Sequence, residues 1–486
     1  MAACTQDNDF TSTGSDLPSR TYPLQISSLT VAPGTRVSES TDGMSSSFDA
    51  GDSFTVELDG ETAIYTVGSD GSITSPSPLY WSDRQTHTVT AWHTTGGSSS
   101  VNLGNQSAGL AYVLHGTGTG SISTPVALTF RHLLAKVRVQ LGGATDGVSS
   151  VQVYGYTSCT YTQGTVSTDG AQQGWIEMHR VEGTDCWEAN LAPVTTVNPS
   201  NFIRLNGNAT ATVTGITGLT AGTVSTLGIT IIPTNATENP TGSVSGSGSY
   251  VFRGNLTTPI NITGGSPHVY LDGATVSVTG GNAISINGNA NPTIHVVGKN
   301  TVTNNSSSTT GAGIYVAQGS SVIIKGSGRS DVLTATGGGD GAGIGGYGEN
   351  STNYNPCGNI TISNVTVYAY GSSNTAMSPG IGSRATCGTI TIDNATVYAR
   401  GRGTNMSSCP AIGSFSSLPN IAISGSDIYA YRGAYINGIS YADWIGQGGD
   451  AFNQRGAIQG TITNTTVYKG KWDGRTETSE GSQVFE

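Results

Sequence analysis

The acidic residues of the C-terminal half are the first candidates for chemistry, because glycoside hydrolysis generally uses two carboxylates about 5 to 10 Å apart. Several proteins with repeated β-coils degrade polysaccharides in this way. When the repeated segments are aligned, Asp393 falls opposite Ser363 and Ser424. Asp427 falls opposite threonines. Neither acid has a carboxylate at the equivalent place in a neighbouring repeat, so the sequence predicts a protein that is not an enzyme.

Metal and cofactor motifs are not found either. The seven His residues are scattered without the spaced His or Cys partners of a metal site or a catalytic triad. No Cys-x-x-Cys pair is present. The segment GGGDGAG (337–343) resembles a calcium-binding repeat but occurs once, and such repeats act by stacking many copies. We therefore expect no metal and no cofactor.

Aromatic residues indicate binding more than catalysis. Tyrosines recur at one position of successive repeats, and a second position beside them alternates Tyr and Arg. Exposed rings with a guanidinium group are suited to holding sugar rings. An equally simple interpretation is an aromatic ladder that only stabilises a sheet. The candidate ligand-binding residues in these two rows are Tyr368, Tyr370, Tyr398, Arg400, Tyr429 and Tyr431.

A long insertion, YADWIGQGGDAFNQRG (441–456), interrupts the last repeats. It carries Trp444 and Phe452, and a loop with aromatic residues on a rigid scaffold is a good binding candidate. The same segment could instead cover the open end of a repeat array, which requires a cap. Both interpretations stay open.

The six cysteines suggest two disulfides and one anchor. Cys159 and Cys186 lie 27 residues apart in one predicted domain, and either could pair or stay reduced. Cys357 and Cys387 occupy matching places one repeat apart, so we expect them within bonding distance. Cys409 is left over.

Cys4 follows Met1-Ala-Ala, which reads like the end of a lipobox. The polar residues after it are typical of a tether. We expect Cys4 to be lipidated and the protein to be held at a membrane by that lipid.

Composition sets the elements that position these residues. Of 486 residues, 70 are Gly and only 10 % are charged, whereas soluble domains have roughly 25 % charged residues. Gly, Ser, Thr and Asn are poor helix formers and suit short strands and turns. The net charge is −11 without any basic cluster, so no nucleic-acid partner is expected. No apolar stretch reaches the roughly 20 residues of a membrane-spanning helix.

Internal repeats define the C-terminal half. GNITISNVTVYAYG begins at Gly358 and GTITIDNATVYARG begins 30 residues later, at Gly388. A period of this length indicates a solenoid, and the β-branched residues favour strands over helices. We expect a parallel β-helix; a β-propeller would need longer units. A second recurring element ends in an isoleucine, in the series Ile284, Ile314, Ile344, Ile381, Ile412 and Ile436.

The N-terminal half consists of short alternating runs between residues 24 and 234. Along it lie, in order, TR (35–36), FDAGD (48–52), PLYW (78–81), LTFRHLLAKVRV (128–139) and GLTAG (218–222). This order resembles the fimbrillin-like (Mfa-like) family of Bacteroidales. The resemblance implies two transthyretin-like β-sandwich domains, at 24–125 and 126–234, and a role in pili.

The resemblance also implies a mode of assembly. In such subunits an N-terminal strand is removed after a basic residue, and a strand from another subunit completes the open sheet. Arg36 matches the place of that cleavage, and Arg20 is the second candidate.

Together these features predict an all-β surface protein. Its segments are a lipoprotein tether (1–23), the two sandwich domains, a linker (235–249) and a parallel β-helix with a terminal cap (250–486). We expect a non-enzymatic adhesin, at a fimbrial tip or as an accessory subunit, at the cell surface or outer membrane. Its partners would be other fimbrial subunits through strand exchange, and host or microbial glycans or proteins. The alternatives are a glycan-active β-helix enzyme, lyase or hydrolase, and a stand-alone glycan-binding lipoprotein.

Overall fold

The protein is built almost entirely of strands. The computed structural model describes residues 17, 20–31, 38–39, 46–211, 213, 215–307, 310–348, 354–372, 377–403, 407–417, 420–433, 443–450, 459–472 and 476–486. Within them, the one helical segment is a 3-10 turn, η1 (Pro199–Asn201). The all-β expectation is therefore confirmed.

The chain divides into two compact units. The first unit comprises Met1–Val139 and Val148–Leu227, and the second comprises Gln140–Gly147 and Gly228–Glu486. Each is described by itself below.

A seven-stranded sheet dominates the first unit. Its strands alternate buried apolar and exposed polar residues, as in β10, where Val126, Leu128 and Phe130 are buried and their neighbours are exposed. The order is β1-β10-β9-β7-β4-β5-β6. The bounds are β1 (Ile26–Val31), β4 (Ser53–Leu58), β5 (Glu61–Val67), β6 (Ile73–Thr74), β7 (His87–Thr94), β9 (Val113–Gly120) and β10 (Val126–His132).

β1 is the edge strand of this sheet and pairs in parallel with β10 alone, from Ile26 opposite Val126 to Val31 opposite Phe130. The sequence-based boundary at 125/126 would have placed β10 in the next domain. The strand instead stays with the first sheet because its buried face packs with the residues of β4 and β5, including Phe54.

Three smaller sheets follow, with the orders β16-β17-β11-β20, β15-β12-β18-β19 and β14-β13-β8. The short strands β2 (Ser38–Glu39) and β3 (Ser46–Ser47) pair with each other. The bounds of the rest are β8 (Ser100–Asn102), β11 (Ala135–Gly143), β12 (Val151–Tyr156), β13 (Ser158–Thr162), β14 (Thr165–Ser167), β15 (Gln173–Glu177), β16 (His179–Arg180), β17 (Cys186–Leu191), β18 (Ile203–Leu205), β19 (Ala209–Ala211) and β20 (Val224–Ile231).

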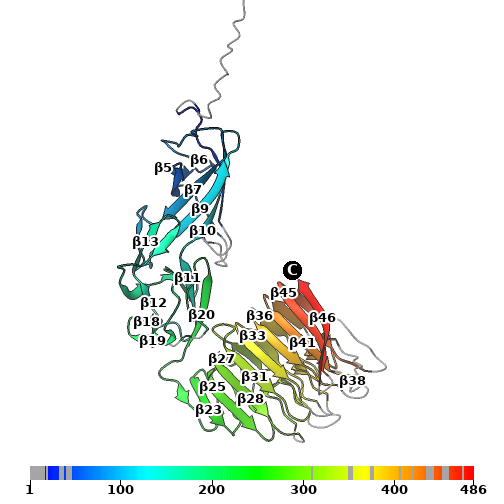
Figure 1. The fold of residues 1–486 in the computed structure, drawn as a ribbon. Coiled ribbons are helices and arrows are strands. Elements are labelled where there is room, and N and C mark those ends of the chain that lie inside the picture. The colour runs from blue at the N-terminus through cyan, green and yellow to red at the C-terminus, as the bar shows by residue number, and fades with distance from the viewer. Residues whose placement is uncertain are drawn as a thin grey trace, which may run out of the picture. The chain divides into compact units, whose positions relative to one another are not determined.

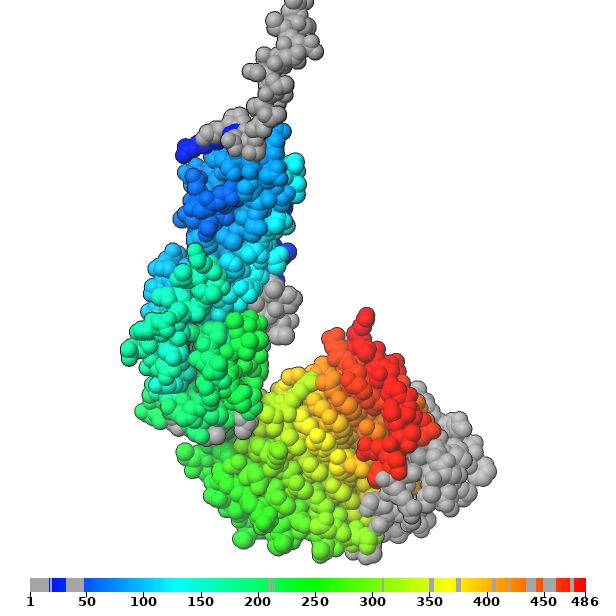
Figure 2. Space-filling view, viewed as in Figure 1, coloured from blue at the N-terminus to red at the C-terminus, as the bar shows by residue number. Residues whose placement is uncertain are grey.

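The second unit is a stack of layers, each formed by the next stretch of chain (Figure 1). Figure 2 shows the colour advancing along this unit from green to red in the same order. Strands of successive layers pair in parallel to make three ladders. β25 (His268–Val278) serves the first two ladders, its first half pairing with β27 and its second half with β28.

The first ladder continues through β27 (Thr293–Val297), β30 (Ser321–Lys325), β33 (Asn359–Ser363), β36 (Ile390–Asp393), β40 (Asn420–Ser424) and β44 (Gln459–Thr463). The second contains β28 (Lys299–Asn304), β31 (Val332–Thr336), β34 (Thr366–Tyr370), β37 (Thr396–Arg400), β41 (Asp427–Gly433) and β45 (Thr465–Trp472). The third contains β22 (Ser243–Val244), β24 (Ile260–Ile262), β26 (Ile284–Ile286), β29 (Ile314–Val316), β32 (Ile344–Gly345), β35 (Ile381–Ser383), β39 (Ile412–Ser414) and β42 (Ile445–Gln447).

Stacked aliphatic residues fill the interior of the second unit. In β34, Val367 and Ala369 are fully buried, whereas Tyr368 and Tyr370 lie on the outer side, as their alternation predicted. The isoleucine series of the third ladder runs as expected through Ile412. Its next member is Ile445 and not Ile436, because the chain makes a longer excursion there; Ile436 lies outside the described residues.

Turn residues between the first two ladders have left-handed backbone conformations. Asn364, Asn394 and Asn464 have φ of 52°, 45° and 46°, and Gly425 occupies the equivalent place with φ of 55°. Asn and Gly tolerate this region best. The Asn394 amide donates to Asn364 Oδ1 at 2.7 Å, which links two layers.

The segment 235–249, expected as a linker, instead forms the first layer. β21 (Thr237–Glu238) pairs with β23 (Ser249–Leu256), and β22 pairs with β24. Val244 is fully buried. The Gly and Ser residues that suggested a linker also serve as corners of a layer, so composition alone did not separate the two.

The last layer is closed by strands that run the other way. β46 (Glu477–Phe485) pairs antiparallel with β45. β38 (Ser407–Ser408) and β43 (Gly449–Asp450) form a second antiparallel pair.

Candidate functional site

Four tyrosines form a continuous row on the outer side of the second ladder. Tyr368, Tyr398, Tyr429 and Tyr468 are direct partners in the strand register. Their successive ring centroids lie 4.5, 4.2 and 4.4 Å apart, and the rings are parallel within 10°. Because each inner ring is covered by its neighbours, these faces are not offered to a sugar. The geometry favours the ladder interpretation over a sugar platform.

The phenol groups of this row stay protonated at ordinary pH. Burial, and then the neighbouring Tyr398, raise the pKa of Tyr429 to about 12. The row therefore presents neutral hydroxyl groups and ring edges.

Arg400 is already engaged by neighbouring side chains. Its guanidinium carbon lies 3.8 Å from the ring centroid of Tyr370 and 4.6 Å from that of Trp472. Its Nε atom lies 3.2 Å from Glu477 Oε1. The next residue of this row, Tyr431, has a raised pKa because of burial and the nearby Glu477. We conclude that Arg400 joins the second ladder to β46 and is not a free ligand-binding group.

Trp444 lies at the end of the stack, in a cluster that we call the cap cluster: Arg432, Trp444, Lys469, Lys471 and Glu480. Glu480 accepts hydrogen bonds from Trp444 Nε1, from Arg432 Nε and from Arg432 Nη2, each at 2.9 Å. Lys471 Nζ lies 2.8 Å from the same carboxylate. Burial by itself raises the pKa of Glu480, but the hydrogen bonds from Arg432 and Lys471 outweigh it and lower the pKa.

A pocket of about 300 Å³ opens beside this cluster, and we call it the cap pocket. Apolar side chains form most of its wall, and a few polar groups converge on it. Lys469 Nζ, on one wall, donates to Gln483 Oε1 at 2.6 Å. This combination of one indole, apolar surface and a few polar groups is typical of small-ligand sites. The lining residues are Asp443, Trp444, Ile445, Ile462, Val467, Lys469, Gln483 and Phe485.

The cysteines behave differently from one another. Cys357 and Cys387, the pair expected from matching layer positions, form a disulfide with Cα atoms 4.5 Å apart. Cys159 and Cys186 do not form one, because they lie on β13 and β17, which belong to different sheets. Cys409 is buried, and burial raises its pKa to about 12.

Carboxylates of the ladders are paired with groups other than carboxylates. Asp393 lies between Ser363 and Ser424 in register, and Ser424 Oγ donates to it at 2.6 Å. Asp427 forms an ion pair with Arg329 at 2.6 Å. Among the described residues, no group of three or more His, Cys, Asp or Glu side chains could hold a metal ion.

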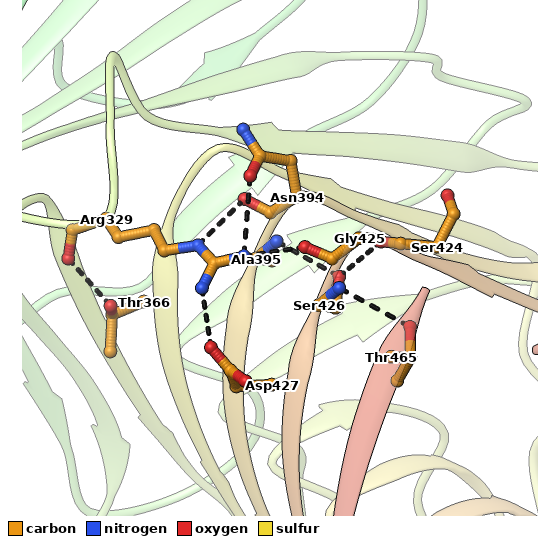
Figure 3. A network of polar contacts seen from close by, with 9 residues as sticks. All are labelled: Arg329, Thr366, Asn394, Ala395, Ser424, Gly425, Ser426, Asp427 and Thr465. Atoms are coloured by element: carbon orange, nitrogen blue, oxygen red, sulfur yellow. Dashed lines mark hydrogen bonds and ion pairs between the residues drawn. The ribbon is translucent and has the colours of Figure 1, made fainter. Parts of the chain in front are cut away.

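Arg329 is a contact that the repeat pattern did not predict (Figure 3). It stands on the turn between β30 and β31 and reaches two layers along the stack. Its Nη2 donates to the carbonyl of Gly425 at 2.6 Å, and its Nη1 binds Asp427. The turn GSGRSD (326–331) has no counterpart in the later repeats, and an unmatched arginine in such an insertion was the available signal.

Other predicted residues lie at or beyond the limits of the described chain. Cys4, Arg36 and Phe452 lie outside the described residues. Arg20 is exposed, with φ of 59°, six residues before β1. Within the described parts of the chain, no helix has the length and apolar character needed to cross a membrane.

Comparison with known proteins points to one family. The model of the fimbrillin-like family matches residues 35–246. No curated protein matches the chain.

Among solved structures, a protein assigned to cell adhesion from Bacteroides uniformis is 18% identical, over 38% of this chain and 88% of its own, with a TM-score of 0.31. One from Bacteroides thetaiotaomicron is 17% identical, over 43% of this chain and 92% of its own, with a TM-score of 0.30. A fimbrial protein from Bacteroides ovatus is 13% identical, over 43% of this chain and 48% of its own, with a TM-score of 0.26. These TM-scores are low, so the assignment rests on the family match.

Proposed function

This chain is fimbrillin-like over residues 35–246, as its sequence markers predicted, and from that premise we propose that it is a non-enzymatic cell-surface adhesin. It would act as a fimbrial tip or accessory subunit. The family match is the observation that carries this proposal. The second unit would be the part displayed for adhesion.

The proposed mode of assembly is strand complementation at the position of β1. β1 has a single partner strand, and Ile26 is its one fully buried side chain. Removal of β1 would leave the main-chain groups of β10 unpaired beside buried Leu128 and Phe130. A strand with alternating apolar residues from another subunit would restore both the hydrogen bonds and the apolar contacts.

Limited digestion with an arginine-specific protease tests this proposal. The first cut should fall after Arg36 or Arg20, and the cut protein should take up a strand from another subunit. The variant with both arginines changed to Ala should stay intact and monomeric. Arg84→Ala, at an exposed arginine of the same unit, is the matched control and should be cut like the parent. Resistance at both sites without any strand exchange would contradict the proposal.

We also propose that the protein is held at the outer membrane through a lipid on Cys4. Cys4→Ser should shift it from the membrane fraction to the medium without changing its secondary structure. Retention of the variant in the membrane fraction would argue against the anchor.

For the architecture, we propose that the sheets of residues 24–234 form transthyretin-like sandwiches and that the second unit is a parallel β-helix. The three parallel ladders and the buried aliphatic stack support the second assignment. A solenoid there would hinder donation of a C-terminal strand, which favours a tip or accessory position over a stalk position.

Glycan binding by the second unit is proposed at the cap pocket, not at the tyrosine row. The mixture of Trp444, apolar surface and convergent polar groups supports this choice. Binding of the full chain to a glycan array should weaken about tenfold or more with Trp444→Ala, because indole contacts often dominate binding. Tyr398→Phe, which keeps the stacked ring, is the matched control and should bind normally. Unchanged binding by Trp444→Ala would exclude the cap pocket.

A further inference from the structure

An uncharged groove lies on the side of the stack, at the turns that precede the first ladder. It has a volume of about 280 Å³ and is lined mainly by polar groups. The turns of three layers supply its side chains, among them Asn291, Gln318, Ser320, Asn359 and Thr386. None of the lining residues carries an ionisable group apart from the disulfide-bonded cysteines. We call it the amide groove.

We propose that the amide groove binds a neutral saccharide. This inference deepens the proposed display role of the second unit and rests on it, but it uses a different surface from the cap pocket.

The hydrogen-bonding groups of the groove are only partly used by the protein. Asn359 Oδ1 accepts from the Thr389 amide at 2.9 Å, which fixes the side chain and leaves its amide nitrogen without a partner among the described residues. The Gln318 side chain is exposed and likewise has no partner there. Side-chain amides both donate and accept, so they match the hydroxyl groups of a sugar.

Ser320 marks the floor of the groove. Its side chain is only 2% exposed, and its Oγ atom has no hydrogen-bond partner among the described residues. A buried hydroxyl without a partner is unfavourable and usually indicates a missing water or ligand group. A sugar hydroxyl, directly or through a water, would satisfy it.

Main-chain groups of the groove wall are already bonded between layers. The Cys357 amide donates to Thr386 O at 2.9 Å, and the Gly388 amide donates to Cys357 O at 2.9 Å. A peptide that adds as a strand needs free main-chain groups, and these are occupied. The absence of charge in the lining disfavours acidic sugars and phosphates. The remaining ligand class is neutral and polyhydroxylated.

The groove is also rigid before any ligand binds. The Cys357–Cys387 disulfide joins two of its layers. A side chain at Gly358 or Gly388 would overlap Ser320 O or Asn359 Oδ1, so the turns are in close contact. A site fixed in this way loses little conformational freedom on binding.

The test uses the full chain and calorimetric titration with a panel of neutral hexasaccharides of glucose, mannose, galactose and xylose. An oligogalacturonate and a Gly-Ser peptide serve as acidic and peptide probes. Gln318→Ala and Ser320→Ala should each weaken binding of a neutral sugar about threefold to tenfold. Ser320→Ala should not lower the unfolding temperature, since it removes an unsatisfied hydroxyl. Gln172→Ala, at an exposed glutamine of the first unit, should bind like the parent.

The outcomes separate this inference from the proposed function. Loss in the two groove variants with normal binding by Trp444→Ala supports the amide groove. Loss only in Trp444→Ala overturns the groove and leaves the cap pocket standing. Preference for the acidic or peptide probe, or no binding of any neutral sugar, overturns the groove while leaving the assembly proposal intact.

Discussion

The seven-stranded sheet of the first unit and the ladders of the second unit use strand pairing in opposite ways. In the sheet, Ile26 pairs with Val126, 100 residues later in the chain. In the second ladder, Tyr368 pairs with Tyr398, only 30 residues later. The first arrangement closes a long loop for every strand that it adds, whereas the second adds each layer from the next stretch of chain.

This difference assigns different roles to the two regions. A sheet with one singly paired edge strand can exchange that strand, which suits assembly between subunits. A stack in which inner strands have partners on both sides is suited to presenting side chains at fixed spacing. Substitutions that unfold one region and spare the other test this division.

Core truncations should have the largest effect. Phe130 is fully buried and contacts Phe54, so Phe130→Ala should destabilise the sheet by about 3–5 kcal/mol. Hydrogen exchange should then rise across all seven strands. Ile392→Ala, at a fully buried position of the first ladder, should lose about 2–5 kcal/mol but raise exchange mainly in adjacent layers. Exchange that rises equally throughout the second unit would contradict layer-by-layer stability.

A single glycine of the third ladder should come next. Gly382 has φ of 128°, and a side chain there would overlap the carbonyl oxygen of Gly413 in the next layer. Gly382→Ala should destabilise the stack by about 1–3 kcal/mol or more, measured by denaturant unfolding. Gly281→Ala is the control, because it also has positive φ (70°) but open space around it. Equal losses in the two variants would show that strain, not layer contact, decides.

Acid should loosen the end of the stack before its middle. The pKa of Glu480 is lowered in the folded protein, so its stabilisation is complete above the pKa of the unfolded chain and is lost as pH falls through the folded value. Hydrogen exchange of β46 should therefore increase in acid, below the ordinary glutamate pKa of about 4.3. Glu480→Gln should have fast exchange in β46 already at neutral pH and little further change in acid. A parent protein with unchanged β46 exchange down to that range would contradict this role.

The Arg329 contacts should matter least. Arg329 and Asp427 are each more than a third exposed, and exposed ion pairs contribute about 0.2–1 kcal/mol. Arg329→Ala should lower stability within that range, and the loss should shrink at high salt. Arg329→Lys, which keeps the charge but not the forked contacts to Gly425, distinguishes geometry from charge. A loss of several kcal/mol would mean that the contact organises the layers.

Sequence reasoning succeeded where a residue's role repeats and failed where it occurs once. The parity of Val367 and Tyr368, and the pairing of Cys357 with Cys387, follow from the period alone. Ile436 was the wrong partner for Ile412 because the insertion breaks that period.

The functional candidates show the same limit. The sequence identified the tyrosine row but not that its rings cover one another, because ring spacing depends on the layer separation. Glu480 and the amide groove had no repeated signal, since their residues come from turns or from an unrepeated strand. Long-range pairing also hid the true sheet of β10, which the sequence had placed after a boundary.

The closing strand β46 has a further consequence. A stack of near-identical layers resembles a crystal face, since its last layer is a template on which any similar strand could deposit. β46 runs against the template, shifts register between Lys469 and Gly470, and carries Glu477 and Glu480. Such reversed, irregular and charged edges resist further deposition. The strand that completes the unit thus also acts as a growth poison, keeping a naturally polymer-like fold at finite length.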